Sequence, residues 1–407
     1  MKAMTRWFPW ALAASLLATL GASGVQAQSI TSIRGLGYPL LPTDARTDAL
    51  GGLGIGLKGL AAPLTDPASA ADVARRGVIV SAVAVEQEVA LGDQLDSSGA
   101  TRLPLIRVLF PVRQLVLTAG YGGFLDQAWA VTRSGQQSTG SSSVGYSDVV
   151  VSTGGIGQFQ VGVAVPLGNR FAIGGTVGAY TGSQRIDFDR RFEGSSIGNL
   201  QPFSESWKWR YTGPMAQIGV RWDPLTILRV GASVTWAGTL SADSVDGPAR
   251  GTEFDLPLQV AGGASAYLAP GLLAALSGRW SGWSSVGTVP SPTPVSGPDV
   301  SGQDTWEIGG GLEWESANQR GTRHFPLRVG AQYRQLPFTF GEGVPTEWYA
   351  GGGIGMRLGA SPDNPLTQID FTIQRGERTA PLGGSEGAEE LTETAWRFSL
   401  ALAIFGT

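Results

Sequence analysis

The sequence contains no cysteine and a single histidine, and charged residues make up only 15% of its 407 positions. Without cysteine, the chain can form neither a disulfide scaffold nor a thiolate metal site. A catalytic triad would depend on His324, which lies beside the polar stretch NQRGTR and has no second histidine for a metal site. The net charge of -4 is weak and spread along the chain, unlike that of a nucleic-acid-binding protein. We therefore expect no enzyme activity, no metal or other cofactor, and no nucleic-acid partner.

The first residues predict export. Lys2 and Arg6 precede the apolar run ALAASLLATL, and the small residues Val25 and Ala27 stand at the positions expected before a cleavage point. A membrane anchor or a cytoplasmic amphipathic helix is the other interpretation of this region. The apolar run is shorter than the roughly 20 residues that a membrane span needs. We expect residues 1–27 to be a cleaved signal peptide.

No later apolar run is long enough for a membrane helix, so a membrane-spanning form of this chain would have to cross as strands. Several segments alternate with period two. In ILRVGASVTWAGTL, Val230, Val234 and Trp236 fall on one face of a strand, and Arg229 and Thr235 fall on the other. A soluble β-sandwich also alternates, but these segments exceed the usual globular strand of about five or six residues.

The connections between these segments alternate in length. Short links lie at 111–114, 166–170, 222–226 and 268–271, whereas long polar connections lie at 91–103, 131–146, 186–206, 240–252, 285–302 and 376–392. Short turns at one end and long loops at the other are typical of bacterial outer-membrane barrels. We predict an all-β fold, a 14-stranded antiparallel transmembrane β-barrel over residues 77–407, with the short turns in the periplasm.

Tryptophans near the predicted strand ends are candidates for the two interfacial girdles, where amphipathic rings prefer to lie. These tryptophans are Trp222, Trp283, Trp306, Trp348 and Trp396.

Residues 28–76 precede the first strand and do not alternate. They contain the glycine-rich run ALGGLGIGLKG at 49–59, which includes Gly52, Gly54 and Gly56. A phosphate-binding loop is excluded because Gly59, rather than Ser or Thr, follows Lys58. The later stretch TDPASAADVARR predicts a short helix with Asp66 as N-cap. Since a barrel of this size leaves a wide lumen, we expect residues 28–76 to fold inside it as a hatch, with Lys58 paired to a lumen acid.

The run DALGGLGIGLKGLAAPLTDPASAADVARRG resembles the N-terminal hatch of the FadL-like outer-membrane family, which includes PorV-like relatives. Asp66, Pro67 and Ala68 stand where the family has Asn-Pro-Ala. The stretches LRVGASVTWAGTL and LPLQVAGGASAYLAPGLLAALSGRWSGWSSV and the last hairpins are also similar to the family. At the C-terminus, Phe405 is out of phase with the outward-facing Ile404.

The resemblance implies an outer-membrane channel for passive uptake of small hydrophobic molecules, either long-chain fatty acids or hydrocarbons. The alternative within the same resemblance is a PorV-like scaffold or shuttle, for which the partner would be a secreted protein. Other implied partners are outer-membrane lipid and, during biogenesis, the barrel-assembly machinery. In the family a kink in the third strand opens the wall sideways, so Gly120, Gly122 and Gly123 are candidates for such an opening.

Charged residues occur on the faces opposite the apolar stripes: Arg229, Arg279, Glu307, Glu313, Arg328, Arg334, Glu347, Arg357, Asp370 and Arg397. Ionisable groups at membrane depth are unfavourable unless they face water or each other, so these side chains should line the lumen. They are expected to hold the hatch to the wall by ion pairs, or else one arginine gates the pore or binds a ligand carboxylate.

Overall fold

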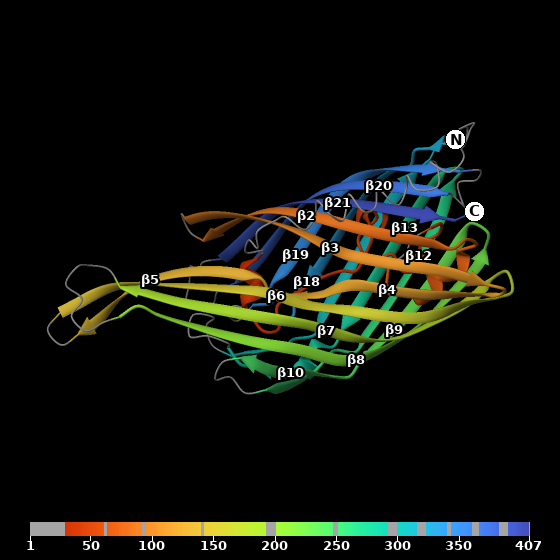
Figure 1. Cartoon of the computed structure of the whole chain (residues 1–407). Coiled ribbons are helices and arrows are strands. Elements are labelled where there is room, and N and C mark those ends of the chain that lie inside the picture. The colour runs from red at the N-terminus through yellow and green to blue at the C-terminus, as the bar shows by residue number, and fades with distance from the viewer. Residues whose placement is uncertain are drawn as a thin grey trace, which may run out of the picture.

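The computed structural model describes residues 29–60, 63–91, 94–139, 142–192, 201–246, 251–291, 299–315, 323–339, 343–359, 366–381 and 390–406. Most of them lie in long antiparallel strands that wrap into one closed sheet (Figure 1). The predicted signal peptide, residues 1–27, lies outside the described residues. Among the residues described, no helix is long and apolar enough to cross a membrane.

Fourteen long strands form the wall: β2 (Gly77–Leu91), β3 (Gln94–Val112), β4 (Leu115–Asp126), β6 (Ser142–Leu167), β7 (Phe171–Phe192), β8 (Phe203–Leu225), β9 (Leu228–Ala237), β12 (Gln259–Ala269), β13 (Leu272–Ser281), β16 (Thr305–Trp314), β18 (Leu327–Gln335), β19 (Thr346–Leu358), β20 (Thr367–Pro381) and β21 (Glu390–Phe405). Each pairs with the next along the chain, and β21 pairs with β2 from Gly77 opposite Phe405 to Ala90 opposite Thr392. This last pairing closes the barrel and confirms the predicted fold class.

The wall has two different ends. At one end, which we call the short-turn end, the links β3–β4, β6–β7, β8–β9 and β12–β13 are tight, and Gly77 meets Phe405 there. At the other end, the long-strand end, β6, β7 and β8 extend far beyond the rest of the barrel together with β5 (Trp129–Thr139) (Figure 1). Shorter strands complete this end: β10 (Thr239–Asp246), β11 (Thr252–Asp255), β14 (Thr288–Val289) and β15 (Val300–Ser301). The two-residue strand β17 (Arg323–His324) precedes β18.

The long polar connections predicted at 91–103, 131–146, 186–206, 240–252 and 376–392 are wrong as loops, because their described residues lie mostly in strands. The strands β5 and β6 pair from Trp129 opposite Ser152 to Thr139 opposite Ser142. Where a hairpin leaves the lipid, both of its faces can meet water, so polar residues replace the alternation while the backbone ladder continues. Composition then resembles that of a loop although the chain remains extended.

The two faces of the wall differ as the alternation predicts. In β9, Val230, Val234 and Trp236 are exposed on the outside, whereas Arg229 and Thr235 are buried inside. The same outward apolar pattern recurs around the barrel, and such a surface suits hydrocarbon rather than water. Of the predicted girdle residues, Trp222, Trp306, Trp348 and Trp396 are exposed on the outside. The prediction is wrong for Trp283, which is 3% exposed in the 3-10 turn η5 (Trp283–Val286) and packs inside the barrel.

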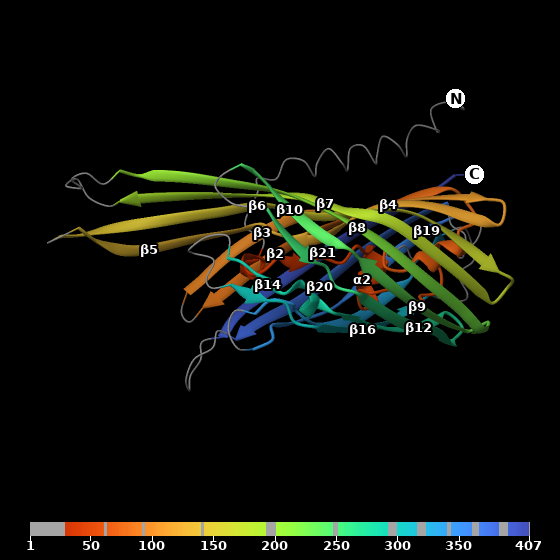
Figure 2. The same ribbon diagram turned by 90° about the horizontal axis from the view of Figure 1, so that it is seen from below.

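The described residues that precede β2, from residue 29 on, lie inside the barrel (Figure 2). They form the 3-10 turn η3 (Ile30–Ile33), the short strand β1 (Tyr38–Pro39), the helix α2 (Ala45–Ala49) and the 3-10 turn η4 (Pro67–Asp72). The helix predicted after the glycine-rich run is thus a 3-10 turn. The residues of α2 are all buried, and the glycine-rich run follows α2 directly. We refer to the described part of residues 28–76 as the hatch segment.

Candidate functional site

The glycine-rich run brings the backbone of the hatch segment against the wall. Gly56 has a φ of +65°, and a Cβ added there would lie 2.7 Å from the backbone nitrogen of Gly231 and 2.8 Å from the carbonyl oxygen of Gly263. Gly52 has a φ of +86°, and its added Cβ would overlap the side chain of Gln332. Gly54 packs against Thr47 of α2 in the same way. At Gly56 and Gly52, side chains larger than hydrogen would therefore separate the hatch segment from β9, β12 and β18.

Asp66 connects the glycine-rich run to η4. One carboxylate oxygen accepts hydrogen bonds from the backbone N–H groups of Ala68 (3.1 Å) and Ser69 (3.2 Å), and the other accepts from the N–H of Gly56 (3.2 Å). Pro67 at the first position of η4 packs on the wall. Asp66 thus caps η4 as predicted from sequence. Burial raises the pKa of the Asp66 carboxyl group, and the backbone donors offset this only in part.

Three groups of charged side chains hold the hatch segment to the wall. The first surrounds Glu313 of β16, which accepts from Arg46 of α2 at 2.8 Å and from Arg328 at 2.6 Å. Arg357 approaches the other oxygen of Glu313 at 3.2 Å. Arg328 also pairs with Asp370 at 2.7 Å, and Arg357 pairs with Glu315 at 2.7 Å, so three arginines face three acids. Because these side chains are almost fully buried, their partners replace the water that they lose.

The second group surrounds Glu347 of β19. Arg334 pairs with Glu347 at 2.6 Å, and the hydroxyl of Tyr38 donates to the same carboxylate at 2.8 Å. Arg378 bridges Glu347 and Glu393. The hydroxyl of Ser29 also donates to Glu393, at 2.8 Å. The start of the hatch segment is therefore fixed near the long-strand end of β20 and β21.

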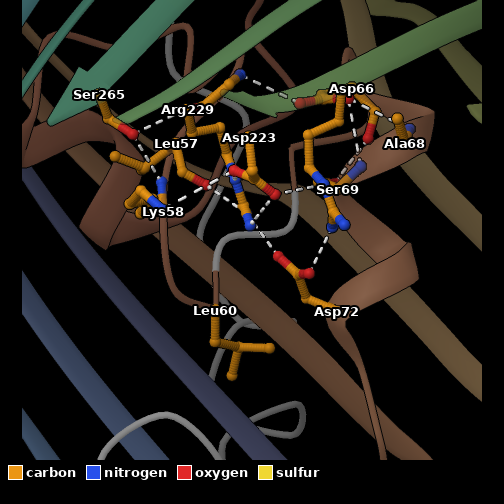
Figure 3. Close-up of polar contacts among 12 residues, drawn as sticks. Leu57, Lys58, Leu60, Asp66, Ala68, Ser69, Asp72, Asp223, Arg229 and Ser265 are labelled. Carbon is orange, nitrogen blue, oxygen red and sulfur yellow. Dashed lines mark hydrogen bonds and ion pairs between the residues drawn. The ribbon is translucent and has the colours of Figure 1, made fainter. Parts of the chain in front are cut away.

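The third group lies at the short-turn end, below η4 (Figure 3). Arg229 pairs with Asp223 at 2.7 Å and also with Asp72 of η4, which in turn pairs with Arg221. The Lys58 ammonium lies 3.7 Å from Asp223 and donates to the Thr226 carbonyl at 2.9 Å. Lys58 therefore has the lumen acid that the sequence led us to expect, although burial lowers its pKa.

The predicted lumen charges do not form one site. Glu313, Arg328, Arg357 and Asp370 come together around α2, while Glu347 and Arg229 belong to the two other groups. Arg397 donates to the amide oxygen of Gln374 at 2.8 Å and lies over the ring of Tyr349. Glu307 pairs with Arg279 at 2.6 Å, on the wall above the hatch segment. The sequence did not point to the hatch residues Arg46, Tyr38 and Asp72 or to the wall residues Asp223, Arg378 and Glu393.

A cavity of about 290 Å³ lies inside the long-strand end, and its lining is mostly apolar. We call it the apolar chamber. Its apolar lining consists of Ile33, Leu36, Trp129, Trp209, Tyr211, Ala242, Phe254, Val289 and Pro290. The polar lining residues include Gln184, which accepts a hydrogen bond from the Tyr211 hydroxyl at 2.9 Å. Apolar walls with a few placed polar groups are typical of sites for small organic molecules.

The wall is incomplete a few residues along the chain from Leu36 and Trp129, which line this chamber. Strands β3 and β4 pair only from Leu105 opposite Gly122 to the turn. Beyond that point, the free side of β4 pairs with β1 of the hatch segment, Tyr38 opposite Asp126 and Pro39 opposite Leu125. Arg102 of β3 forms an ion pair with Asp126 across the gap. The hatch segment thus occupies the place of a missing wall strand.

Gly120, Gly122 and Gly123 lie next to this gap. Gly120 and Gly122 keep regular register with β3 and β6, and the register shift falls between Gly123 and Leu125. The three glycines give room to the hatch segment, because Cβ atoms added there would overlap Leu64, Pro42 and Leu40 respectively. The glycine cluster therefore lies where the two strands separate, and the register shift begins at its last member, Gly123.

No protein-family model and no curated protein matches the sequence. Solved structures match the fold. A FadL homologue of Pseudomonas aeruginosa has a TM-score of 0.59 at 12% identity, covering 91% of this chain and 99% of that chain. The Pseudomonas putida toluene transporter TodX has a TM-score of 0.55 at 14% identity, covering 92% and 99%. The Ralstonia pickettii toluene transporter TbuX has a TM-score of 0.52 at 15% identity, covering 91% and 99%. The predicted resemblance to the FadL-like barrels is confirmed at the level of the fold.

Proposed function

We propose that this chain is a bacterial outer-membrane channel for the diffusive uptake of small hydrophobic molecules. The observation that supports it most is an apolar chamber inside a closed barrel, together with a gap in the wall that is filled by the hatch segment. The TodX and TbuX structures, which share this fold, are of toluene transporters. Lipopolysaccharide-rich leaflets resist apolar solutes, so a protein-lined path inward has a physical purpose.

In this proposal the short-turn end faces the periplasm and the long-strand end faces the exterior. Residues 1–27 are removed on export, residues 28–76 form the hatch, and residues 77–407 form the barrel. Molecules enter the apolar chamber from outside. The inner half of the lumen is filled by the ion pairs around Glu313 and Asp223, which makes a straight path unfavourable. Exit is therefore sideways, through the gap between β3 and β4 after β1 leaves it.

The PorV-like role is the second candidate, because the filled inner half of the lumen is also what a non-transporting scaffold would show. Its partner would be a secreted protein that docks on the long strands at the exterior. The apolar chamber favours transport, since a scaffold has no need of it. Native mass spectrometry of the purified protein separates the two: a co-purified apolar molecule supports transport, and a co-purified secreted protein without one contradicts it.

Uptake can be tested by filling the chamber. Ala242 is 4% exposed and lines it, whereas Ala232 on β9 is exposed on the outer surface. We expect Ala242→Trp to reduce uptake of labelled dodecane at least tenfold in lipopolysaccharide-bearing cells, and Ala232→Trp, the same change on the lipid side, to leave it unchanged. If cells with and without the protein take up dodecane equally, the proposed function is wrong.

A further inference from the structure

A belt of inward-facing polar side chains runs along the wall over five neighbouring strands, β8, β9, β12, β13 and β16. Its members follow the strand register: Gln217 lies opposite Thr235, Thr235 opposite Gln259, Gln259 opposite Ser281, and Ser281 opposite Thr305. Arg279 and Glu307 are cross-strand partners next to this row. A path for molecules without polar groups does not need such a belt. The belt therefore indicates that the ligand carries a polar group.

The belt surrounds a narrow cavity of about 40 Å³. Since a water-sized group needs roughly 10–15 Å³ by this measure, the cavity can hold a small head group but not a folded alkyl chain. Apolar side chains lie beside the polar ones in the lining: Pro39, Leu40, Pro42, Leu64, Phe124, Met215, Trp283, Leu336 and Pro337. The ring of Tyr180, which also lines it, packs on Phe124 with centroids 4.3 Å apart. The cavity therefore joins a polar wall to an apolar one.

Three buried atoms of this belt lack a hydrogen-bond partner within the described part of the chain. They are the Gln217 amide oxygen, the Glu307 Oε1 and the Arg279 Nε. Gln217 and Glu307 are 6% and 7% exposed, so bulk water does not satisfy them. The remaining atoms are in use, since the Gln217 amide donates to the Thr65 carbonyl at 2.8 Å and Arg279 Nη2 donates to Glu307 Oε2 at 2.6 Å. The belt thus offers two acceptors and one donor.

The charge of the belt selects among head groups. Arg279 and Glu307 neutralise each other, and glutamines, threonines and serines supply the rest. A carboxylate would meet the Glu307 charge and could donate no hydrogen bond to either free acceptor. A hydrocarbon would leave all three buried atoms unsatisfied. A hydroxyl group both donates and accepts, so it can satisfy the free donor and one of the two free acceptors.

We infer that the polar belt binds the hydroxyl group of a neutral amphiphile, such as a long-chain alcohol, with only the first carbons of its chain against the apolar lining of the cavity. This inference rests on the proposed function and narrows its ligand class. The polar belt then acts as a selectivity element on the inner face of the wall. At the polar belt, a hydroxyl group replaces the hydrogen bonds that it loses to water, whereas a fatty acid or an alkane does not form these hydrogen bonds.

The test compares 1-dodecanol, dodecanoate and dodecane, which share one chain length, in binding to the full-length mature protein in nanodiscs at about pH 8, where the acid is ionised. We expect wild-type protein to bind dodecanol at least tenfold more tightly than either of the others. Glu307→Gln leaves Arg279 without its counter-charge. Because a hydrogen bond to a charged group contributes about 1.5–3 kcal/mol, dodecanoate should gain roughly tenfold to a hundredfold over dodecanol in this variant.

Glu315→Gln is the matched control, since it makes the same charge change beside His324, away from the polar belt. It should leave the preference of the wild type unchanged. If Glu307→Gln does not fold, Gln259→Leu takes its place and should raise dodecane affinity relative to dodecanol. Equal wild-type binding of dodecanol and dodecane, or an unchanged ratio in Glu307→Gln, overturns the inference alone. Binding of none of the three ligands overturns the proposed function as well.

Discussion

Replacing Gly56 by alanine should release the hatch segment from the wall. At a φ of +65°, alanine is disfavoured by about 1–2 kcal/mol. Its Cβ would also overlap backbone atoms of Gly231 and Gly263, which cannot rotate away, and overpacking of this kind costs about 1–3 kcal/mol. The two effects together weaken docking by about 2–5 kcal/mol, which is roughly a thirtyfold to several-thousandfold rise in the undocked population.

Trypsin digestion of the folded protein in detergent measures this population. Arg46 and Lys58 are 1% and 8% exposed, so trypsin can cut after them only when the hatch segment undocks. Gly168→Ala is the matched control, because Gly168 has a φ of +70° but nothing within 4 Å of its added Cβ. Alanine at position 168 has the same unfavourable positive φ as alanine at position 56, but its Cβ overlaps no neighbouring atom. If both variants are cut after Arg46 at the same rate, close approach to the wall does not hold the hatch segment.

Other predictions concern the polar anchors. Arg46→Met should accelerate trypsin cleavage after Lys58. Removing one partner of a buried ion pair weakens docking by about 3 kcal/mol at the lower end of the usual range. The lower end applies here because Glu313 keeps its contacts with two other arginines. Arg397→Met, which removes a partner of Gln374 rather than of an acid, should change this cleavage much less. Docking of the hatch segment raises the pKa of Asp66, so docking favours the protonated carboxyl group. Docking should therefore be strongest below the unfolded pKa of about 3.9 and should weaken as the pH rises through the raised pKa. The measurement is amide hydrogen exchange of residues 45–58 as a function of pH, corrected for intrinsic exchange rates. Asp66→Asn should abolish the loss of protection with rising pH. The same pH dependence in both proteins would contradict the role of Asp66.

The wall could be predicted from the sequence because lipid and lumen impose opposite chemistry on alternate residues. In β9 the outward Val234 and Trp236 and the inward Ser233 and Thr235 show this directly. The alternation fails where water reaches both faces, which is why β5 was assigned to a loop. It also cannot separate an interfacial tryptophan from a buried one, so Trp283 was placed outside although it packs against Phe124 and Phe338.

The glycine-rich run and the Asp66 cap were recognisable because their requirements are local. Positive φ favours glycine, and an N-cap favours a short acceptor beside its own helix. The ion pairs were not recognisable as pairs. Glu313 meets Arg328 through the register of β16 with β18, and it meets Arg46 only because α2 docks inside the barrel. A single sequence shows which charges face inward but not which of them meet.

The position of β1 could not be predicted either. Tyr38 and Pro39 have no alternation around them, and a two-residue strand leaves no periodic signal. Their pairing with β4 depends on the early separation of β3, which the glycines at 120, 122 and 123 marked only approximately. The position of the gap therefore depends on how β3 and β4 pair, which local sequence patterns do not show.

The central claim, that hydrophobic molecules pass when β1 leaves the gap, can be tested by locking β1 in place. Pro39 and Leu125 are paired residues of β1 and β4, and the chain has no cysteine of its own, so Pro39→Cys with Leu125→Cys can form only this crosslink within the protein. We measure uptake of labelled dodecane and 1-dodecanol by lipopolysaccharide-bearing cells, with Leu125→Cys alone as control. The account predicts that oxidation lowers uptake to that of cells lacking the protein and that reduction restores it. Equal uptake by the oxidised and reduced double variant would contradict it.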